Sequence, residues 1–430
     1  MKIAVIALGK IGLPLAVQFA DRGHEVVGVD VNRSVVELVN AGSEPFPGEA
    51  HLAEKLAALV PAGRLRATTE YGAAVPGADA VVVVVPLFVD PTTAEPDFRW
   101  MDSATRSLAA HLTEGTLVSY ETTLPVGTTR NRWRPMLEDG SGLVEGRDFD
   151  LVFSPERVLT GRIFADLRKY PKLIGALSAG GARRAAEFYR AVLEFDPRTD
   201  LPRGNGVWDL GSAEAAEMAK LAETTYRDVN IGLANQFARF AGEHAIDVYQ
   251  VIEASNSQPY SHIHSPGIAV GGHCIPVYPR LYLWNDPHAT VVRAAREANA
   301  SMPAYTVALL EGAHGDLAGQ TVAVLGASYR GGVKETAFSG VFATVEALQA
   351  KGAQVVVHDP MYADGELQAL GFIPFHLGDK ADAVVVQADH AEYRDLAPDD
   401  VPGVRTLVDG RRVTDPATWA GVTRRVIGAP

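Results

Sequence analysis

The only cysteine of the chain, Cys274, lies in the segment SPGIAVGGHCIPVYP, which is rich in glycine and proline. Such a backbone suits the close approach of a ligand better than it suits core packing. A thiolate is a nucleophile that forms covalent intermediates with carbonyl carbons. A lone cysteine is more often a small buried hydrophobic residue. The flanking Gly271, Gly272, His273 and Pro276 favour the nucleophile here.

A glycine turn near the start of the chain follows a β-branched run and precedes a helical pattern. The turn consists of Ala7, Leu8, Gly9, Lys10, Ile11 and Gly12. With Asp30 about twenty residues further on, this is the dinucleotide-binding fingerprint with its first glycine replaced by alanine. Gly9 would admit the pyrophosphate, Gly12 would let helix and strand pack, and Asp30 would bind a ribose diol, which favours NAD over NADP. The alternative is a tight turn that binds no cofactor, and the methyl group of Ala7 predicts weakened or altered cofactor contact.

A polar stripe follows one face of a long helical segment. Its members, at spacings of three and four, are Lys220, Glu223, Thr224, Arg227, Asn230 and Ile231. The opposite face carries Leu221, Ala222, Val229 and Leu233. From periodicity alone, the stripe predicts a solvated face of an amphipathic helix rather than a functional site.

The elements that must position these residues alternate between strand and helix. Short apolar strands are expected at residues 2 to 8, 24 to 29, 80 to 85, 116 to 120 and 151 to 153, which predicts a doubly wound parallel sheet. After a Pro- and Gly-rich region at residues 196 to 206, one long helix is expected from residue 208 to residue 245. A further strand at residues 321 to 325 and the segment VEALQAKGAQVVVHDP repeat the opening pattern, which predicts a second Rossmann-like unit.

The composition excludes several classes of protein. A chain of 430 residues needs more than one core. The net charge of -13 argues against a nucleic-acid partner. One cysteine forms no intramolecular disulfide, and the opening MKIAVIALGKIGLPLA does not resemble a secretory signal, so a cytoplasmic location is expected. No apolar run approaches the roughly 20 residues that cross a bilayer, so no membrane partner is expected.

Six ordered segments carry a resemblance that covers nearly the whole chain. They are ALGKIGLPLA, ETTLPVGTT at residues 121 to 129, SPERVLTGR at 154 to 162, KLAETTYRDVNIGLANQ at 220 to 236, VGGHCIP at 270 to 276 and VLGASYRGGVKETAFSG at 324 to 340. With these motifs the chain resembles the nucleotide-sugar 6-dehydrogenase superfamily, which includes UDP-glucose, UDP-N-acetylglucosamine and UDP-N-acetylmannosamine dehydrogenases. The form GGHCIP is closer to the N-acetylamino-sugar branch.

The resemblance implies a four-electron oxidation of a C6 alcohol to a carboxylate, with two NAD used in succession and a thioester on Cys274. It implies that Lys220 stabilises alkoxide and oxyanion charge, that Glu156 activates or positions the hydrolytic water, and that Thr123 holds water and cofactor. Asn230 would fix the substrate.

The resemblance also implies two sets of contact residues. Cofactor contacts are expected from Gly9, Lys10, Ile11, Gly12, Asp30, Arg33, Pro86, Thr123, Glu156 and Lys334. Substrate contacts are expected from Arg157, Lys220, Asn230, Tyr260, His264, Gly267, Gly271, Gly272 and Tyr278. No metal is expected.

The expected architecture is α/β, with two Rossmann-like doubly wound domains joined by a long central helix and a helical dimerisation region. The NAD-binding domain would span 1–203, the central substrate and dimerisation domain 204–310, and the nucleotide-sugar-binding domain 311–430. A homodimer built on the long helix is expected by analogy with the family.

Four positions depart from the family pattern. Thr224 replaces an asparagine and Tyr278 an aspartate of the expected catalytic shell, and we hypothesise that the two hydroxyls jointly replace the missing contacts. Tyr260 and Ala337 each replace an arginine on the substrate side. Lys334, Arg280 or His262 would have to compensate, although a solvated surface role is favoured for each of the three.

The substrate expected is a UDP-N-acetylhexosamine or UDP-hexose, with a dTDP-sugar as the outlier. Two alternatives stay open: a two-electron dehydrogenase on the same fold, and a nucleotide-sugar-binding relative without turnover. A thiol is needed only for the longer oxidation, so Cys274 discriminates against the first. Catalysis is favoured over mere binding because Thr123, Glu156, Lys220, Asn230 and Cys274 all stand in their expected motifs.

Overall fold

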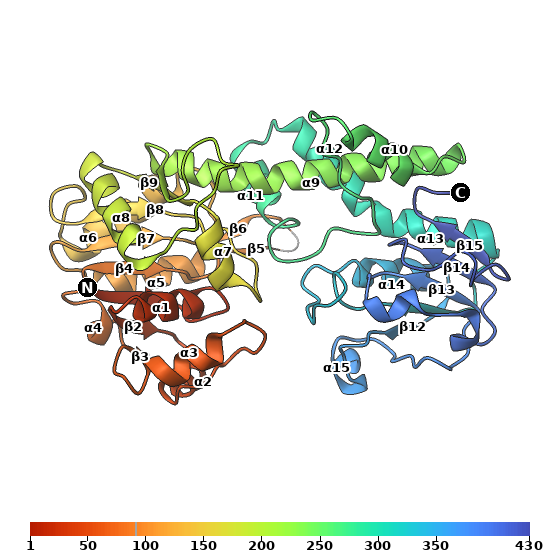
Figure 1. The fold of residues 1–430 in the computed structure, drawn as a ribbon, viewed down its shortest axis with the longest axis horizontal. Coiled ribbons are helices and arrows are strands. Elements are labelled where there is room, and N and C mark those ends of the chain that lie inside the picture. The colour runs from red at the N-terminus through yellow and green to blue at the C-terminus, as the bar shows by residue number, and fades with distance from the viewer. Residues whose placement is uncertain (91–92) are drawn as a thin grey trace. The chain divides into compact units, whose positions relative to one another are not determined.

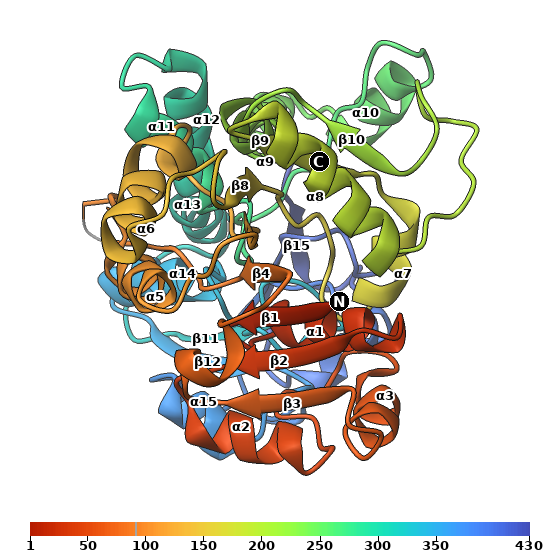
Figure 2. The ribbon, with the colours of Figure 1, turned by 90° about the vertical axis from the view of Figure 1, so that its left-hand side faces the viewer.

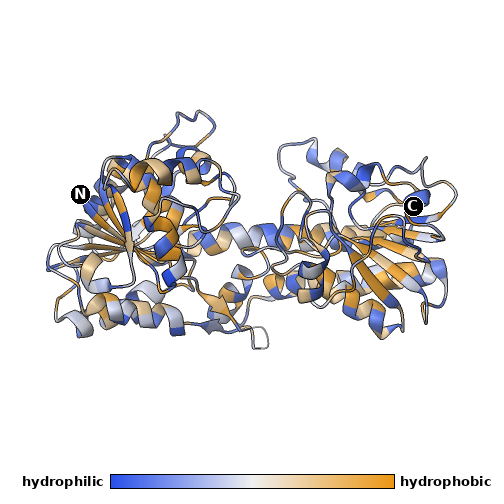
Figure 3. Cartoon of the chain, turned by 90° about the horizontal axis from the view of Figure 1, so that it is seen from below, coloured by the Kyte–Doolittle hydropathy of each residue, from blue (hydrophilic) through white to orange (hydrophobic). Residues whose placement is uncertain are grey.

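The computed structural model describes residues 1–90 and 93–430 (Figure 1). The chain divides into two compact units, Met1–Ala222 and Glu223–Pro430. Each unit is built around a largely parallel sheet whose strands are the most apolar part of the chain (Figure 3). This is the architecture expected for sheets that are covered by helices on both faces.

The first unit contains an eight-stranded sheet in the order β10-β9-β8-β7-β4-β1-β2-β3. The strands are β1 (Lys2–Ile6), β2 (Glu25–Val29), β3 (Leu65–Thr68), β4 (Ala80–Val83), β7 (Leu117–Tyr120), β8 (Asp150–Phe153), β9 (Lys172–Ala176) and β10 (Val207–Asp209). All pairs are parallel except β8 with β9. The chain reverses its winding direction between β1 and β4, so the carboxyl ends of these strands border the crevice where such folds bind ligands.

Helices cover both faces of this sheet. They are α1 (Gly12–Asp21), α2 (Arg33–Asn40), α3 (Leu52–Leu59), α4 (Tyr71–Ala74), α5 (Arg99–Ala109), α6 (Arg134–Ser141), α7 (Ile163–Lys169) and α8 (Ala179–Val192). Figure 2 shows α5 and α6 on one side of the sheet and α7 and α8 on the other. Side chains of α1, α7 and α8 share one buried core with β1 and β2. A π-helical turn at Thr129–Trp133 leads into α6, and β5 (Phe88–Val89) pairs with β6 (Pro96–Asp97).

The second unit contains a five-stranded parallel sheet in the order β12-β11-β13-β14-β15. The strands are β11 (Thr321–Leu325), β12 (Gln354–His358), β13 (Ala383–Val386), β14 (Thr406–Asp409) and β15 (Thr423–Val426). The helices are α10 (Val248–Asn256), α11 (Tyr278–Asn285), α12 (Thr290–Ala300), α13 (Met302–His314), α14 (Val341–Ala350) and α15 (Asp364–Ala369), with 3-10 turns at Ala391–Arg394 and Pro398–Asp400. The 31-residue helix α9 (Ala213–Glu243) begins in the first unit and continues into the second.

The predicted fold class is confirmed, since both Rossmann-like sheets and the long helix are present. The predicted start of the long helix is wrong. Trp208 belongs to β10, where it pairs with Leu173 of β9, and the helix begins only at Ala213. Gly211, at φ +83°, separates the two elements. A long segment without proline carries no local sign of an edge strand, because that strand forms only by pairing with β9.

Among the helices of the described residues, none combines the length and the apolar character that a bilayer crossing requires.

Candidate active site

The turn between β1 and α1 has the geometry of a dinucleotide-binding loop. A Cβ atom added at Gly12 would lie 1.9 Å from the carbonyl oxygen of Ala7, so this position accepts only glycine. A Cβ atom added at Gly9 would meet nothing within 4 Å. Ala7 has φ 76°, in the left-handed region where alanine is strained by about 1 kcal/mol. The turn therefore keeps the left-handed conformation typical of glycine at this position, although alanine now occupies it.

Asp30 ties the end of β2 to this turn. One of its carboxylate oxygens accepts the N–H of Leu8 and the other accepts the N–H of Asn32, each at 2.8 Å. Each oxygen keeps a second lone pair for a ribose hydroxyl. The other predicted cofactor residues of this unit lie around the same edge of the sheet: Lys10 and Ile11 in the turn, Arg33 at the start of α2 and Pro86 after β4. Lys10, Arg33 and Pro86 are exposed.

Replacing Gly9 by alanine should separate cofactor binding from folding. Because the added methyl group meets no protein atom, we expect the free energy of unfolding to change by less than about 0.5 kcal/mol. If the pyrophosphate approaches the backbone at Gly9, the same methyl group should raise the Kd for NAD at least about tenfold. Calorimetric titration with NAD and thermal denaturation measure the two effects. Gly12→Ala is the matched variant and should lose stability as well, whereas unchanged NAD affinity in Gly9→Ala would refute this placement of the cofactor.

The segment after β7 carries Thr123, which is 4% exposed. The hydroxyl of Thr122 donates to the carbonyl oxygen of Val85 at 2.7 Å, which fixes the segment to the end of β4. Glu217 of α9 holds its far end. Its carboxyl group accepts the N–H of Gly127 at 2.5 Å and both the N–H and the hydroxyl of Thr129, at 2.9 and 2.6 Å.

The solvated face predicted for the stripe on α9 is wrong at two of its members. Lys220 is 7% exposed and Thr224 is 5% exposed. On the opposite side, Ala222 is exposed and Leu233 is 44% exposed. Which side chains of a helix are buried depends on the neighbouring elements that pack against it, and the polarity pattern of the helix alone does not reveal those neighbours.

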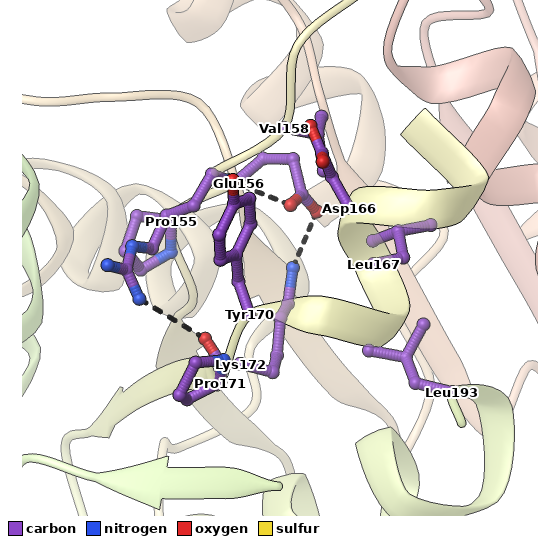
Figure 4. Close-up of a pocket in the computed structure, with 10 residues that line it drawn as sticks. Pro155, Glu156, Val158, Asp166, Leu167, Tyr170, Pro171, Lys172 and Leu193 are labelled. Carbon is purple, nitrogen blue, oxygen red and sulfur yellow. Dashed lines mark hydrogen bonds and ion pairs between the residues drawn. The ribbon is translucent and has the colours of Figure 1, made fainter. Parts of the chain in front are cut away.

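A small hollow in the first unit is lined by Glu156 and Arg157 after β8, by residues of α7 and β9, and by Leu193, which directly follows α8 (Figure 4). Glu156 accepts the backbone N–H of Arg157 at 2.8 Å, and its second oxygen lies 2.8 Å from the ammonium of Lys172. The guanidinium of Arg157 donates to the carbonyl oxygen of Pro171 at 3.4 Å. Burial raises the pKa of Glu156, but the Lys172 ammonium and these hydrogen bonds lower it more, so the net shift is downward.

The sequence prediction missed Lys172 and its second partner, Glu121. The one sequence signal was a lysine that opens an otherwise apolar strand in YPKLIGA. The lysine pairs with two carboxylates that lie 16 and 51 positions away in the chain, so its own segment does not reveal these partners.

In the second unit, Asn230 of α9 fixes the loop that precedes the cysteine. Its amide nitrogen donates to the carbonyl oxygen of His262 at 2.6 Å, and its oxygen accepts the N–H of His264 at 2.9 Å. Asn235, also on α9, accepts the N–H of Gly267 at 2.9 Å. Tyr260 lies in the same loop and is 92% exposed. The predicted substrate residues Asn230, His264 and Gly267 are thus brought together.

The predicted glycines pack against two side chains that the sequence prediction missed, Arg411 and Tyr329. A Cβ atom at Gly267 would lie 2.7 Å from a guanidinium nitrogen of Arg411, and one at Gly271 would lie 2.4 Å from Cβ of Tyr329. Gly272, at φ +93°, donates its N–H to the carbonyl oxygen of Ala337 at 2.8 Å. Burial lowers the pKa of Arg411, which follows the end of β14. The sequence signal that could have identified Arg411 was an arginine just after the carboxyl end of a strand in a Rossmann-like unit.

Cys274 is half-buried in the turn that leads into α11. Its carbonyl oxygen accepts the N–H groups of Val277 and Tyr278 at 3.2 and 2.9 Å. Tyr278 is half-buried and is the first residue of α11. The preceding His273 lies 3.2 Å from a carboxylate oxygen of Glu335.

The three cations considered as substitutes for the missing arginines occupy different settings. Lys334 is exposed and pairs with Glu366, with its ammonium 2.6 Å from the carboxylate. His262 is also exposed. Arg280 of α11 is half-buried, and burial lowers its pKa. Of the three, only Arg280 departs from the solvated surface role favoured by the sequence.

Family models match three successive parts of the chain. The NAD binding domain of the UDP-glucose/GDP-mannose dehydrogenase family matches residues 1–193, its central domain matches 214–301, and its UDP binding domain matches 323–416. These matches include the glycine turn, the stripe on α9, the cysteine loop and the arginine that follows β14.

The chain is similar along its length to several named dehydrogenases. It is 36% identical to the UDP-N-acetyl-D-mannosamine dehydrogenase of Pyrococcus horikoshii, over 96% of each chain. The solved structure of a UDP-D-ManNAc dehydrogenase from that organism matches with a TM-score of 0.87 at 33% identity, covering 100% of this chain and 99% of the other. An NDP-N-acetyl-D-galactosaminuronic acid dehydrogenase from Methanosarcina mazei matches with a TM-score of 0.84 at 29% identity, covering 99% and 95%. The chain therefore belongs to the UDP-glucose/GDP-mannose dehydrogenase family and is an NAD-dependent nucleotide-sugar dehydrogenase.

Proposed function

We propose that the chain oxidises the C6 alcohol of a nucleotide sugar to a carboxylate through a thioester on Cys274. The residues of the turn after β1 and Asp30 fit NAD, which when bound accepts a hydride in each of the two oxidations. The thiolate of Cys274 adds to the C6 aldehyde and forms a C–S bond, giving a thiohemiacetal. Its oxygen then supplies the electron pair that drives the second hydride from C6, which leaves the thioester.

The remaining steps assign roles to side chains outside the cysteine loop. Lys220, buried and cationic, stabilises the negative charge that develops on the oxygen at C6. Glu156 takes a proton from the water that attacks the thioester carbonyl. The C–S bond then breaks, and the thiolate of Cys274 is restored. Thr123 holds water and cofactor, and Asn230 fixes the loop that borders the substrate.

The observation that carries this proposal is the construction of the cysteine loop. Cys274 closely follows Gly271, where a Cβ atom would collide with Tyr329, and Gly272, which has a φ of +93°. The cysteine is half-buried rather than part of the core. A structural cysteine would be expected in an apolar core. A half-buried thiol on a tightly packed loop suits a nucleophile that must meet a substrate carbon.

We further propose a UDP-N-acetylhexosamine as substrate. The similar proteins named above are dehydrogenases of UDP- or NDP-linked N-acetylamino sugars, and the GGHCIP loop agrees with that branch. UDP-hexoses and dTDP-sugars are the alternatives. Arg411, Tyr329 and the glycines of the loop would border the nucleotide sugar, with Arg157, His264 and Tyr278 as further contacts.

The test is the amount of NADH released per molecule of sugar, measured with UDP-N-acetylmannosamine, UDP-N-acetylglucosamine, UDP-glucose and dTDP-glucose. Two NADH per sugar and a carboxylate product are expected from one of the UDP-N-acetylhexosamines. One NADH per sugar would indicate the two-electron dehydrogenase. NAD binding without NADH from any sugar would indicate a binding protein.

A homodimer is proposed from an apolar stripe on α9, defined by Tyr226, Leu233, Phe237 and Phe240. These side chains are 58%, 44%, 38% and 57% exposed, and their spacing places them on one face of the helix. Several exposed apolar side chains on one face of a helix favour association. Sedimentation velocity should give twice the chain mass, and Leu233→Asp should give the single-chain mass; a wild-type monomer at micromolar concentration would contradict the proposal.

The division into domains at 1–203, 204–310 and 311–430 also stays a proposal, supported by the three separate family matches. A cytoplasmic location stays a prediction, which rests on the single cysteine and the absence of an intramolecular disulfide that follows from it.

A further inference from the structure

A buried lysine joins two carboxylates at the edge of the first sheet where β7 and β8 end. The ammonium of Lys172 lies 2.6 Å from an oxygen of Glu121 and 2.8 Å from an oxygen of Glu156. The side chain of Lys172 is 4% exposed, that of Glu121 is fully buried and that of Glu156 is 10% exposed. One ammonium therefore balances two carboxylates in a place that water hardly reaches.

The two carboxylates have different surroundings. The second oxygen of Glu121 accepts the hydroxyl of Tyr189 of α8 at 2.7 Å, and that hydroxyl also lies 2.6 Å from the hydroxyl of Ser119. The ammonium of Lys172 lies 4.9 Å from the centre of the Tyr189 ring. Glu156, in contrast, borders the small hollow, which Glu121 does not line (Figure 4). Of the two carboxylates paired with Lys172, Glu156 is therefore the one placed to exchange a proton with a molecule in that hollow.

We infer that Lys172 and Glu121 are positioning residues for Glu156. The ammonium of Lys172 holds the Glu156 carboxylate at the hollow, and Glu121 shares that ammonium. This inference rests on the proposed role of Glu156 in thioester hydrolysis. A lysine paired with a single buried carboxylate would make that carboxylate a weak base, because the cation strongly favours the ionised form. A second carboxylate on the same ammonium offsets part of this effect, so Glu156 stays ionised and yet basic enough to take a proton from water.

The titration behaviour of the cluster agrees with this division of roles. Burial raises the pKa of Glu121 to about 7, against the opposing effect of Lys172, and the charge of Glu156 raises it further. Burial lowers the pKa of Lys172, but the two carboxylates raise it more, so the ammonium persists. The net shift of the pKa of Glu156 is downward. As the pH falls, Glu121 is therefore protonated before Glu156.

Other titratable groups also face the cluster. Tyr189 contacts Glu121 from α8, and burial raises its pKa well above the ordinary value, so it stays neutral. Arg157, Asp166 and Tyr170 line the same hollow as Glu156. Asp166 is held by the guanidinium of Arg162 at 2.9 Å. These groups are left unchanged in the variants below, so a shift in the pH profile reports on the three-residue cluster.

The test is Glu121→Gln, with the rate of thioester hydrolysis measured by single-turnover quench between pH 5.5 and 9. Glutamine keeps the shape but removes the competing charge, so Lys172 pairs with Glu156 alone. We expect the wild-type rate to fall as the pH drops through about 7, because protonation of Glu121 there leaves the Lys172 ammonium to Glu156 alone. Glu121→Gln should lose this step and show the low rate across the whole range. We expect the rate at pH 8 to fall about tenfold. Lys172→Arg, which keeps the cation, should retain a measurable profile.

Ser119→Ala is the matched control. It removes a contact of Tyr189 without changing the charge of the cluster and should leave the midpoint unchanged. If Glu121→Gln binds NAD normally, unfolds at the wild-type Tm and keeps the wild-type midpoint, the inference is overturned. Glu156→Gln separates this failure from failure of the proposed function. If Glu156→Gln hydrolyses the thioester at the wild-type rate, then the role proposed for Glu156 is itself wrong, whatever Glu121→Gln does.

Discussion

Cys274→Ala is expected to lower the rate of carboxylate formation by at least about 10³-fold, as is usual when a covalent nucleophile is removed. Without the thiol, the C6 aldehyde forms no thiohemiacetal, so no alkoxide is available to drive the second hydride from carbon. The variant should therefore release no more than one NADH per sugar. Stoichiometric NADH measurement, together with identification of the sugar product by mass spectrometry, checks both expectations.

The fold and the cofactor site should survive this substitution. Cys274 is half-buried and outside the apolar core, so calorimetry should give the wild-type Kd for NAD and the wild-type Tm. Two NADH per sugar from the alanine variant would rule out the thioester. Tyr278→Phe is the companion variant: if the Tyr278 hydroxyl and Thr224 replace the missing family contacts, activity falls, and full activity in Tyr278→Phe would count against that hypothesis.

Glu217→Ala is expected to destabilise the first unit by roughly 3 kcal/mol. The substitution removes the acceptor of three buried hydrogen bonds from Gly127 and Thr129 and leaves those donors without a partner. It also opens a cavity, since the Glu217 side chain is fully buried. A fall in Tm of about 6–12 °C corresponds to this loss and can be followed by circular dichroism.

Glu214→Ala, one helical turn earlier on α9, provides the control for that measurement. Glu214 pairs with Arg130 at 2.5 Å, and both side chains are about one-third exposed, at 30% and 34%. A partly solvated ion pair contributes less than about 1 kcal/mol. Equal losses of stability in the two variants would contradict the assignment of Glu217 as the buried anchor of the segment that carries Thr123.

Local patterns in the sequence predicted much of the fold. The β-branched runs of β1 and β11 and the glycine turn before α1 depend on interactions within a few residues, and so their approximate bounds follow from the order of residue types. The helical content of α9 followed in the same way, while β10 did not. Trp208 is extended only because a strand 35 positions earlier offers a free edge.

For the candidate site, the sequence by itself determined which reactive groups the chain carries. Cys274 and Asp30 were identified from chemical type and local motif, whereas Lys220 and Glu156 were identified through the resemblance to a known family. The tertiary structure decided how they are held. It buried Lys220 on a face that periodicity assigned to solvent, brought Glu121 and Glu156 to the ammonium of Lys172, and packed Arg411 against Gly267. These outcomes depend on burial and on pairing between residues far apart in the chain, which hydrophobic periodicity within one segment does not encode.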